Sequence, residues 1–287
     1  MTQLALRVVH IYFDGLTLDR SHSSILSSSN FPRSIGSQEP ADCRRVFKAI
    51  FERYSKLELT QINDRPVAIA GLEYRLAQAY GTHIIFGILQ NHFAESLLWR
   101  RAGTEWMEPL VDATNWMLPD SNGLHVPTWS WTAYKGGISY DLPSHALFRG
   151  DSIELITFPW GPKGICVLMA PLAQIRTGCS IGKCRDDNGC EVWDIQSGRI
   201  GRIWFDARPP SRGEALTLEC IPLAERILRQ EPRTRSTWIE GIQGWQIRFV
   251  MFIVRSAIAD LKIWHRLGVG AIESEYVTVT EKKAFVA

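Results

Sequence analysis

The sequence has no large excess of charge of either sign and no long apolar run. Its 287 residues include 32 Lys and Arg against 30 Asp and Glu, a formal net charge of +2, so no general attraction to nucleic acid or an acidic membrane is expected. The most apolar stretch, residues 249–254, lies between two arginines and is far too short to span a bilayer as a helix. The first residues lack the cleavage site of a secretory signal peptide. These absences predict a cytoplasmic protein that binds neither nucleic acid nor membrane.

Catalytic and cofactor motifs are also missing. The sequence has no Gly-x-Ser-x-Gly nucleophile elbow and no phosphate-binding P-loop. The Gly-Val-Gly run at 268–270 lacks the third glycine and the strand-to-helix setting of a dinucleotide-binding loop. His92 and Glu95 lie three residues apart, but no second pair of this kind exists to build a di-metal centre. We therefore predict no catalytic residue, no cofactor and no metal.

The six cysteines do not have the spacing of a zinc site. Cys179, Cys184 and Cys190 are separated by four and five residues in a region rich in Gly, Asp and Asn, whereas zinc ligands usually come in pairs two to four residues apart. In a reducing cytoplasm these side chains are expected to be ordinary thiols in a hairpin loop.

Helical patterns occupy the first half of the chain. Asp42 is a favoured N-cap, and apolar residues follow it at helical spacing: Val46, Phe47, Ile50, Phe51 and Tyr54. The opposite face carries Arg44, Arg45, Lys48, Glu52 and Arg53. A second helix is predicted to begin at Asn63 or Asp64, with Pro66 in its first turn, and to stop at Gly81. A third apolar segment, 84–99, contains Gly87, which weakens a helical interpretation.

After about residue 123 the pattern changes to short β-prone runs separated by turn residues. They lie at 128–133, 138–140, 153–158, 165–170, 202–207, 215–221, 246–254, 262–269 and 276–280. Helices followed by strands predict an α+β fold whose second part is mainly antiparallel, a sandwich or a partly open barrel. The expected divisions are a hairpin at 1–20, a flexible Ser-rich linker at 21–40, a helical segment at 41–122 and a β-rich region at 123–287 packed on the helices.

Tryptophan is abundant, with 11 residues in the chain. Trp129 and Trp131 alternate in a β-prone run before the pair Gly136 and Gly137, which predicts a hairpin with both indoles on one face. Most buried indoles fill a core. The alternative is a sugar-stacking platform on a sheet, formed by Trp129, Trp131, Trp160, Trp193 and Trp204.

Three segments resemble the carboxyl-terminal half of fungal heterokaryon-incompatibility (HET-domain) proteins. The first, 54–71, contains Tyr-Ser, Leu-Thr, Asp64-Arg65 and Ala-Ile-Ala-Gly; the second, 87–100, ends in Leu-Leu-Trp-Arg; the third, 127–140, contains the Trp-Ser-Trp signature. Their order and spacing are similar to those of the family. The residues that the resemblance marks as structural are Asp64, Arg65, Gly71, Trp99, Pro127, Trp129, Trp131 and Tyr140. Asp64 is expected to cap its helix, and Arg65 to reach an acidic neighbour or a carbonyl.

The resemblance also departs from the family pattern. Pro66 and Val67 replace the usual Leu-Pro, Thr128 and Thr132 replace Ser and Ala, and Ile88 stands where the family has tryptophan. The HET domain itself is largely missing, and residues 1–20 are similar to its final strands.

The resemblance implies a non-catalytic region of a truncated or decayed HET-family protein, linked to fungal nonself recognition and incompatibility cell death. An unknown protein partner fits this role. The alternatives are a carbohydrate-binding β-sandwich that uses surface tryptophans, and a hydrolase of unmarked type.

Overall fold

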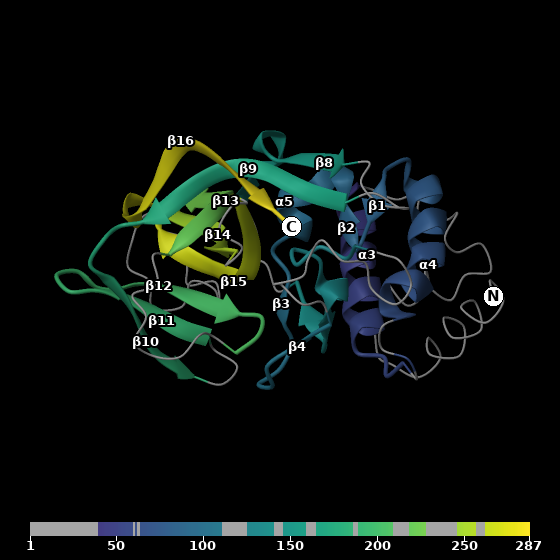
Figure 1. Ribbon diagram of the computed structural model, residues 1–287, viewed down its shortest axis with the longest axis horizontal. Coiled ribbons are helices and arrows are strands. Elements are labelled where there is room, and N and C mark those ends of the chain that lie inside the picture. Colours follow the sequence, from purple (N-terminus) through teal and green to yellow (C-terminus); the bar gives the residue numbers. More distant parts are fainter. Residues whose placement is uncertain are drawn as a thin grey trace.

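The structure, a computed structural model, describes residues 40–59, 61, 64–110, 125–140, 146–158, 165–185, 189–208, 218–227, 246–256 and 262–287. The predicted hairpin at 1–20 and the linker, apart from its last residue, lie outside this part of the chain. Two helices precede a mainly antiparallel sheet (Figure 1), which confirms the α+β prediction. No helix within the described ranges is long and apolar enough to cross a membrane.

The first helix, α3 (Pro40–Ser55), buries the apolar face that its periodicity predicts. It begins at Pro40, two residues before the expected cap Asp42. The second helix, α4 (Arg65–Tyr80), has Asp64 at its N-cap position, but the Asp64 side chain makes no cap hydrogen bond. Gly81 ends α4 in the left-handed region (φ 66°), as its sequence position predicts.

The apolar segment after α4 is broken into short elements. Strands β1 (Ile84–Ile85) and β2 (Ile88–Leu89) form a hairpin, whose two turn residues, Phe86 and Gly87, have positive φ of 50° and 76°. The elements that follow are η3 (Gln90–His92), α5 (Phe93–Ser96), β3 (Arg100–Arg101) and β4 (Glu108–Pro109).

The predicted hairpin around the two tryptophans is wrong. The Ser130 hydroxyl accepts the Thr132 N–H at 3.0 Å and caps a short 3-10 helix, η4 (Trp131–Ala133). Strands β5 (Tyr134–Lys135) and β6 (Ile138–Ser139) then pair with β4 and β3 respectively. Each half of the expected hairpin therefore finds its partner in residues 100–109.

Ten strands of the described chain form one sheet in the order β10-β11-β12-β15-β14-β13-β9-β16, with β7 beside β13 and β8 beside β9. The bounds are β7 (Leu147–Phe148), β8 (Glu154–Phe158), β9 (Ile165–Ile175), β10 (Cys179–Arg185), β11 (Gly189–Asp194), β12 (Gly198–Phe205), β13 (Glu219–Ile227), β14 (Gln246–Arg255), β15 (Ile263–Glu273) and β16 (Val277–Val286), with short helices η5 (Gly150–Ser152) and η6 (Ser274–Tyr276). Parallel pairing of β15 with β16 bends the sheet into a partial ring. This matches the predicted partly open barrel.

Strands β10 and β11 occupy the region expected to be a cysteine-bearing loop. Cys184 and Cys190 are opposite each other in this antiparallel pair and are joined by a disulfide. The expectation of ordinary thiols is therefore wrong at these two positions. Cys179, Cys166 and Cys220 are free. No group of three metal-ligating side chains occurs among the residues that the structure describes.

One hydrophobic core joins the helices to the sheet. The same cluster of buried residues contains Phe47 of α3, Leu76 of α4, Trp99 and Phe249 of β14. In Figure 1, α3 and α4 stand at one end of the molecule and the ring of strands at the other, with α5 and β3 between them.

Candidate functional site

The tryptophans marked by the resemblance are core residues. Trp99, Trp129 and Trp131 each have a relative exposure of 0%. The Trp131 ring lies 5.7 Å from that of Phe51 and 6.1 Å from that of Tyr54, both on α3. This confirms that the paired indoles fill a core.

The alternative, a sugar-stacking platform of five tryptophans, does not form from the described rings. Trp204 is buried like Trp129 and Trp131, while Trp193 is 41% exposed. Trp160 lies outside the described residues. The Trp193 indole N–H donates to the Glu191 carboxylate at 3.2 Å.

Hydrogen bonds connect the three segments that resemble the HET family. Arg65, only 1% exposed, donates to the carbonyl oxygens of Tyr134 at 2.6 Å, Gly136 at 3.2 Å and Ser55 at 2.8 Å. The expected carbonyl partner of Arg65 is thus confirmed.

The two indole N–H groups complete these connections. Trp99 Nε1 donates to the Trp129 carbonyl at 3.1 Å, and Trp131 Nε1 donates to the Gly87 carbonyl at 3.4 Å. Each bond joins the second segment, 87–100, to the third, 127–140.

The other residues that the resemblance marks as structural differ in burial and in contacts. Pro127 is buried, and its carbonyl accepts the Ser130 N–H at 3.0 Å. Tyr140 is buried, and its N–H donates to Glu52 at 2.5 Å. Gly71 and Asp64 lie on the exposed side of α4, and a Cβ added at Gly71 would meet nothing within 4 Å. The position of Gly71 therefore imposes no steric need for glycine.

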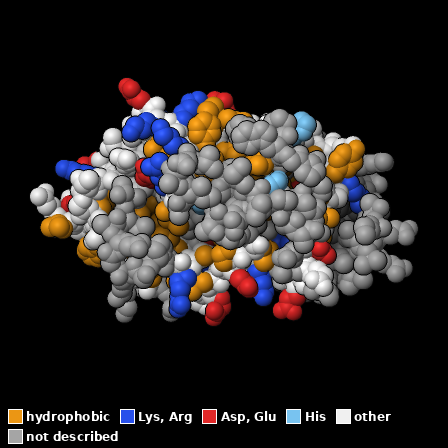
Figure 2. All heavy atoms as spheres, viewed as in Figure 1, with side chains coloured by type: hydrophobic (Ala, Val, Ile, Leu, Met, Phe, Trp, Pro, Cys, Tyr) orange, Lys and Arg blue, Asp and Glu red, His pale blue; other side chains and the backbone are white. Residues whose placement is uncertain are grey.

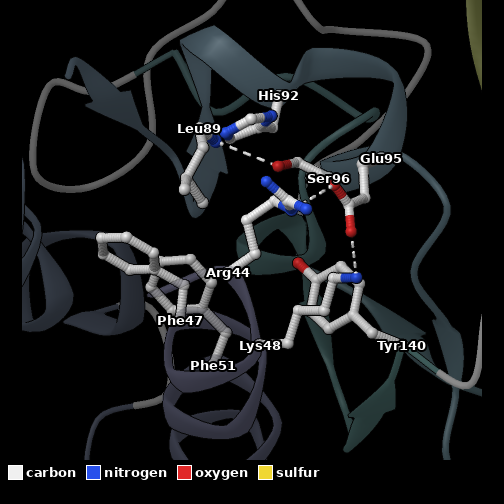
Figure 3. A pocket seen from close by; sticks show the side chains of 9 residues that line it. All are labelled: Arg44, Phe47, Lys48, Phe51, Leu89, His92, Glu95, Ser96 and Tyr140. Atoms are coloured by element: carbon white, nitrogen blue, oxygen red, sulfur yellow. Dashed lines mark hydrogen bonds and ion pairs between the residues drawn. The ribbon is translucent and has the colours of Figure 1, made fainter. Parts of the chain in front are cut away.

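A charged pocket lies between α3, α5 and Tyr140 (Figure 3). Its cavity is about 10 Å³, room for about one water molecule. The lining residues are Arg44, Phe47, Lys48, Phe51, Leu89, His92, Glu95, Ser96 and Tyr140. We call this group the α3–α5 pocket.

Two cations in the α3–α5 pocket share one carboxylate. The Lys48 ammonium donates to Glu95 Oε1, and Arg44 Nε lies 3.4 Å from Glu95 Oε2. The Glu95 side chain is 11% exposed, against 31% for Arg44 and 23% for Lys48. Burial, followed by the positive charge of Arg44, lowers the pKa of His92, with a smaller lowering from Lys48 and an opposing effect of Glu95. The imidazole is therefore neutral near pH 7.

Tyr140 contributes a buried hydroxyl to this pocket. Its Oη has no hydrogen-bond partner among the described residues. Burial, followed by the negative charge of Glu52, raises the pKa of the Tyr140 phenol, so it stays protonated. Figure 3 shows the Tyr140 ring beside Lys48 at the wall of the pocket.

The pocket shows no nucleophile–base pair of the kind that a hydrolase needs. The hydroxyl of Ser96 accepts the backbone N–H of Leu89 at 3.3 Å. In the part of the chain that the structure describes, no histidine side chain is hydrogen-bonded to a hydroxyl or thiol.

Sequence reasoning missed this pocket. It placed Arg44 and Lys48 on the polar face of their helix and His92 with Glu95 in an ordinary contact. The signal was the helical spacing of two polar pairs. Arg44 and Lys48 lie four residues apart and His92 and Glu95 three residues apart, so each pair can present one side. Nothing in the sequence shows that these two sides meet.

Neither charge sign dominates the described side chains on the face shown in Figure 2. Basic and acidic side chains are both present there among the described residues, with apolar side chains between them.

Neither protein-family models, nor curated proteins, nor solved structures match this chain.

Proposed function

We propose that this protein serves as a non-catalytic scaffold of the HET type, acting in fungal nonself recognition and the cell death that follows incompatible fusion. The observation that supports this proposal is the mutual packing of the three segments that resemble the family. Residues 54–71, 87–100 and 127–140 are far apart in sequence and converge in one core.

The contacts explain, in physical terms, why the residues that resemble the family occur together in one chain. Arg65 of the first segment donates to two carbonyls of the third, at Tyr134 and Gly136. Trp99 of the second segment donates to Trp129 of the third. Buried donors need partners, and these donors find them in the other matching segments.

A scaffold role fits the way in which polar groups are used. The two Nη groups of Arg65 and the indole N–H groups of Trp99 and Trp131 donate to main-chain carbonyls inside the protein. Their side chains are almost fully buried, so they hold segments together and are not available to a substrate. The protein would then act through its surface, on a protein partner.

Hydrogen bonds of Arg266 connect the second matching segment, 87–100, to the sheet. Arg266 of β15 donates to the carbonyl oxygens of Leu97 at 2.6 Å and Trp99 at 2.5 Å, and forms an ion pair with Asp206.

The proposed site of action is the cytoplasm. The disulfide between Cys184 and Cys190 argues against it, because cytosolic thiols are kept reduced. Imaging of a fluorescent fusion tests the compartment, and a diffuse cytoplasmic signal is expected. Secretion of the fusion would contradict the proposal.

Inducible expression in a filamentous fungus tests the function. Expressing hyphae are fused with non-expressing hyphae, and death of the fusion compartment is scored with a vital dye. Death is expected with the natural sequence and with Trp193→Ala, which changes an exposed ring. It is expected to be lost with Trp131→Ala, which removes a core ring. Survival of every fusion although the protein is folded and present would contradict the proposal.

A further inference from the structure

The α3–α5 pocket holds an internal carboxylate in the manner of a bound anion. Glu95 is the anion, and Lys48 with Arg44 supply two positive charges from successive turns of α3. Lys48 and Arg44 carry two positive charges against the single charge of Glu95, while the Glu52 carboxylate beside Tyr140 lies outside the cavity lining. The two cations therefore favour an anion at the place that Glu95 occupies.

The Tyr140 hydroxyl is a donor that Glu95 does not use. It is buried, protonated and without a partner among the described residues, and it lines the same cavity. Buried polar groups are almost always hydrogen-bonded. An orphaned hydroxyl that faces a cavity of about 10 Å³ points to an occupant of the cavity.

The position of Glu95 allows it to be exchanged. It belongs to α5, a helix of only four residues, while both cations belong to the 16-residue α3. The side chains of Arg44 and Lys48 are partly exposed, so an anion can reach them from solvent.

We propose that the α3–α5 pocket binds a small oxyanion, a carboxylate or a phosphate, in the place of the Glu95 carboxylate. Lys48 and Arg44 neutralise its charge, and the Tyr140 hydroxyl donates a hydrogen bond to it. In the ligand-free protein the Glu95 carboxylate stands in for the ligand and competes with it. This site is independent of the proposed scaffold role, and nothing in it requires the HET resemblance.

Titration calorimetry with sodium phosphate and with sodium acetate, at constant ionic strength, tests the site. Glu95→Gln removes the competitor and its negative charge, so it is expected to bind anion about ten-fold more tightly than the natural sequence. The matched control, Glu58→Gln, changes an exposed carboxylate outside the pocket and is expected to leave the affinity unchanged. The anion that binds more tightly assigns the ligand to the phosphate or the carboxylate class.

Variants of the donors decide whether the binding is specific. In the Glu95→Gln background, Lys48→Gln is expected to lower the affinity at least ten-fold, while Arg45→Gln, the same charge change at an exposed residue of α3, leaves it unchanged. Tyr140→Phe keeps the ring and is expected to lower the affinity several-fold. Near-ultraviolet circular dichroism confirms that each variant is folded.

Three results would overturn the proposal. One is the absence of binding of both anions to folded Glu95→Gln. Another is an equal loss of affinity in Lys48→Gln and Arg45→Gln, which would mean a general charge effect. The third is an unchanged affinity in Tyr140→Phe, which would remove the hydroxyl as a ligand donor.

Discussion

The indole of Trp131 lies so close to Gly87 that a Cβ added to this glycine would fall 2.0 Å from Nε1. The same indole N–H donates to the Gly87 carbonyl at 3.4 Å. Gly87 also has a φ of 76°, a backbone conformation that residues with a side chain rarely adopt. The turn of the β1–β2 hairpin and the Trp-Ser-Trp segment therefore fit only while residue 87 has no side chain.

Gly87→Ala should destabilise the protein by about 2–4 kcal/mol, because the methyl group adds a clash with Trp131 to the cost of a left-handed backbone. Urea unfolding followed by tryptophan fluorescence measures the loss. The matched control is Gly71→Ala on the exposed side of α4, where a Cβ meets nothing within 4 Å. It should stabilise the protein by about 0.5–1 kcal/mol. Equal effects at the two glycines would contradict this account.

Removal of the Trp131 ring should cost about 3–5 kcal/mol, the usual range for a large core residue changed to alanine. The ring is 0% exposed and contacts Phe51 and Tyr54. Trp193→Ala serves as the comparison, since that indole is 41% exposed, and it should cost under about 1 kcal/mol. Chemical denaturation of both variants checks the difference. A loss under 1 kcal/mol for Trp131→Ala would show that its indole is not a core anchor.

The elements that could be predicted from sequence are those specified by local periodicity. The apolar spacing of α3 and the stop signal at Gly81 act within one or two turns of helix. Most β-prone runs of the second half likewise appear as strands, since side chains on one face of a strand recur every two residues. The exception is 128–133, where η4 forms instead.

The pairing of strands that lie far apart in the sequence could not be predicted. Strands β5 and β6 contain two residues each, and their partners β4 and β3 lie about 25 to 40 residues earlier in the chain. A glycine pair between two β-prone runs favours a local hairpin, but β5 and β6 pair with β4 and β3 instead. The pocket was hidden for the same reason, because α5 and Tyr140 come from segments distant from α3.

The ion pair between Arg266 and Asp206 was also invisible in the sequence, and it supports a prediction of its own. Both side chains are at most 1% exposed, with Arg266 Nε 2.7 Å from Asp206 Oδ2. Asp206→Ala should cost about 3–5 kcal/mol, because it leaves a buried guanidinium without its counter-ion. Thermal and urea unfolding of Asp206→Leu, of Arg266→Leu and of the variant with both changes form a double-mutant cycle. The double variant should lose clearly less than the sum of the two single changes; strict additivity would mean that the two groups do not interact.

Glu73 should make the stability of the protein depend on pH in an unusual direction. Its carboxyl is 7% exposed, and burial raises its pKa from 4.5 to about 7, although the Gly87 N–H that it accepts at 2.5 Å partly opposes the rise. A raised folded-state pKa means that the folded chain binds this proton more tightly than the unfolded chain. The resulting stability is fully present below pH 4.5 and is lost as the pH rises through about 7, a total of about 3 kcal/mol.

Glu73→Gln should abolish that dependence, because an amide does not titrate and its oxygen can still accept the Gly87 N–H. Free energies of unfolding measured by urea titration between pH 4.5 and 8 should fall with pH in the natural sequence and in Glu58→Gln, an exposed carboxylate. The Glu73→Gln profile should be flatter by about 3 kcal/mol over this range. Since Gly87 joins Glu73 to Trp131, ionised Glu73 weakens the protein at the contact between α4, the hairpin turn and the Trp-Ser-Trp segment. If the free energy of unfolding falls equally with pH in the natural sequence and in Glu73→Gln, the Glu73 carboxylate is in contact with water. Its ionisation then does not affect the stability of the protein.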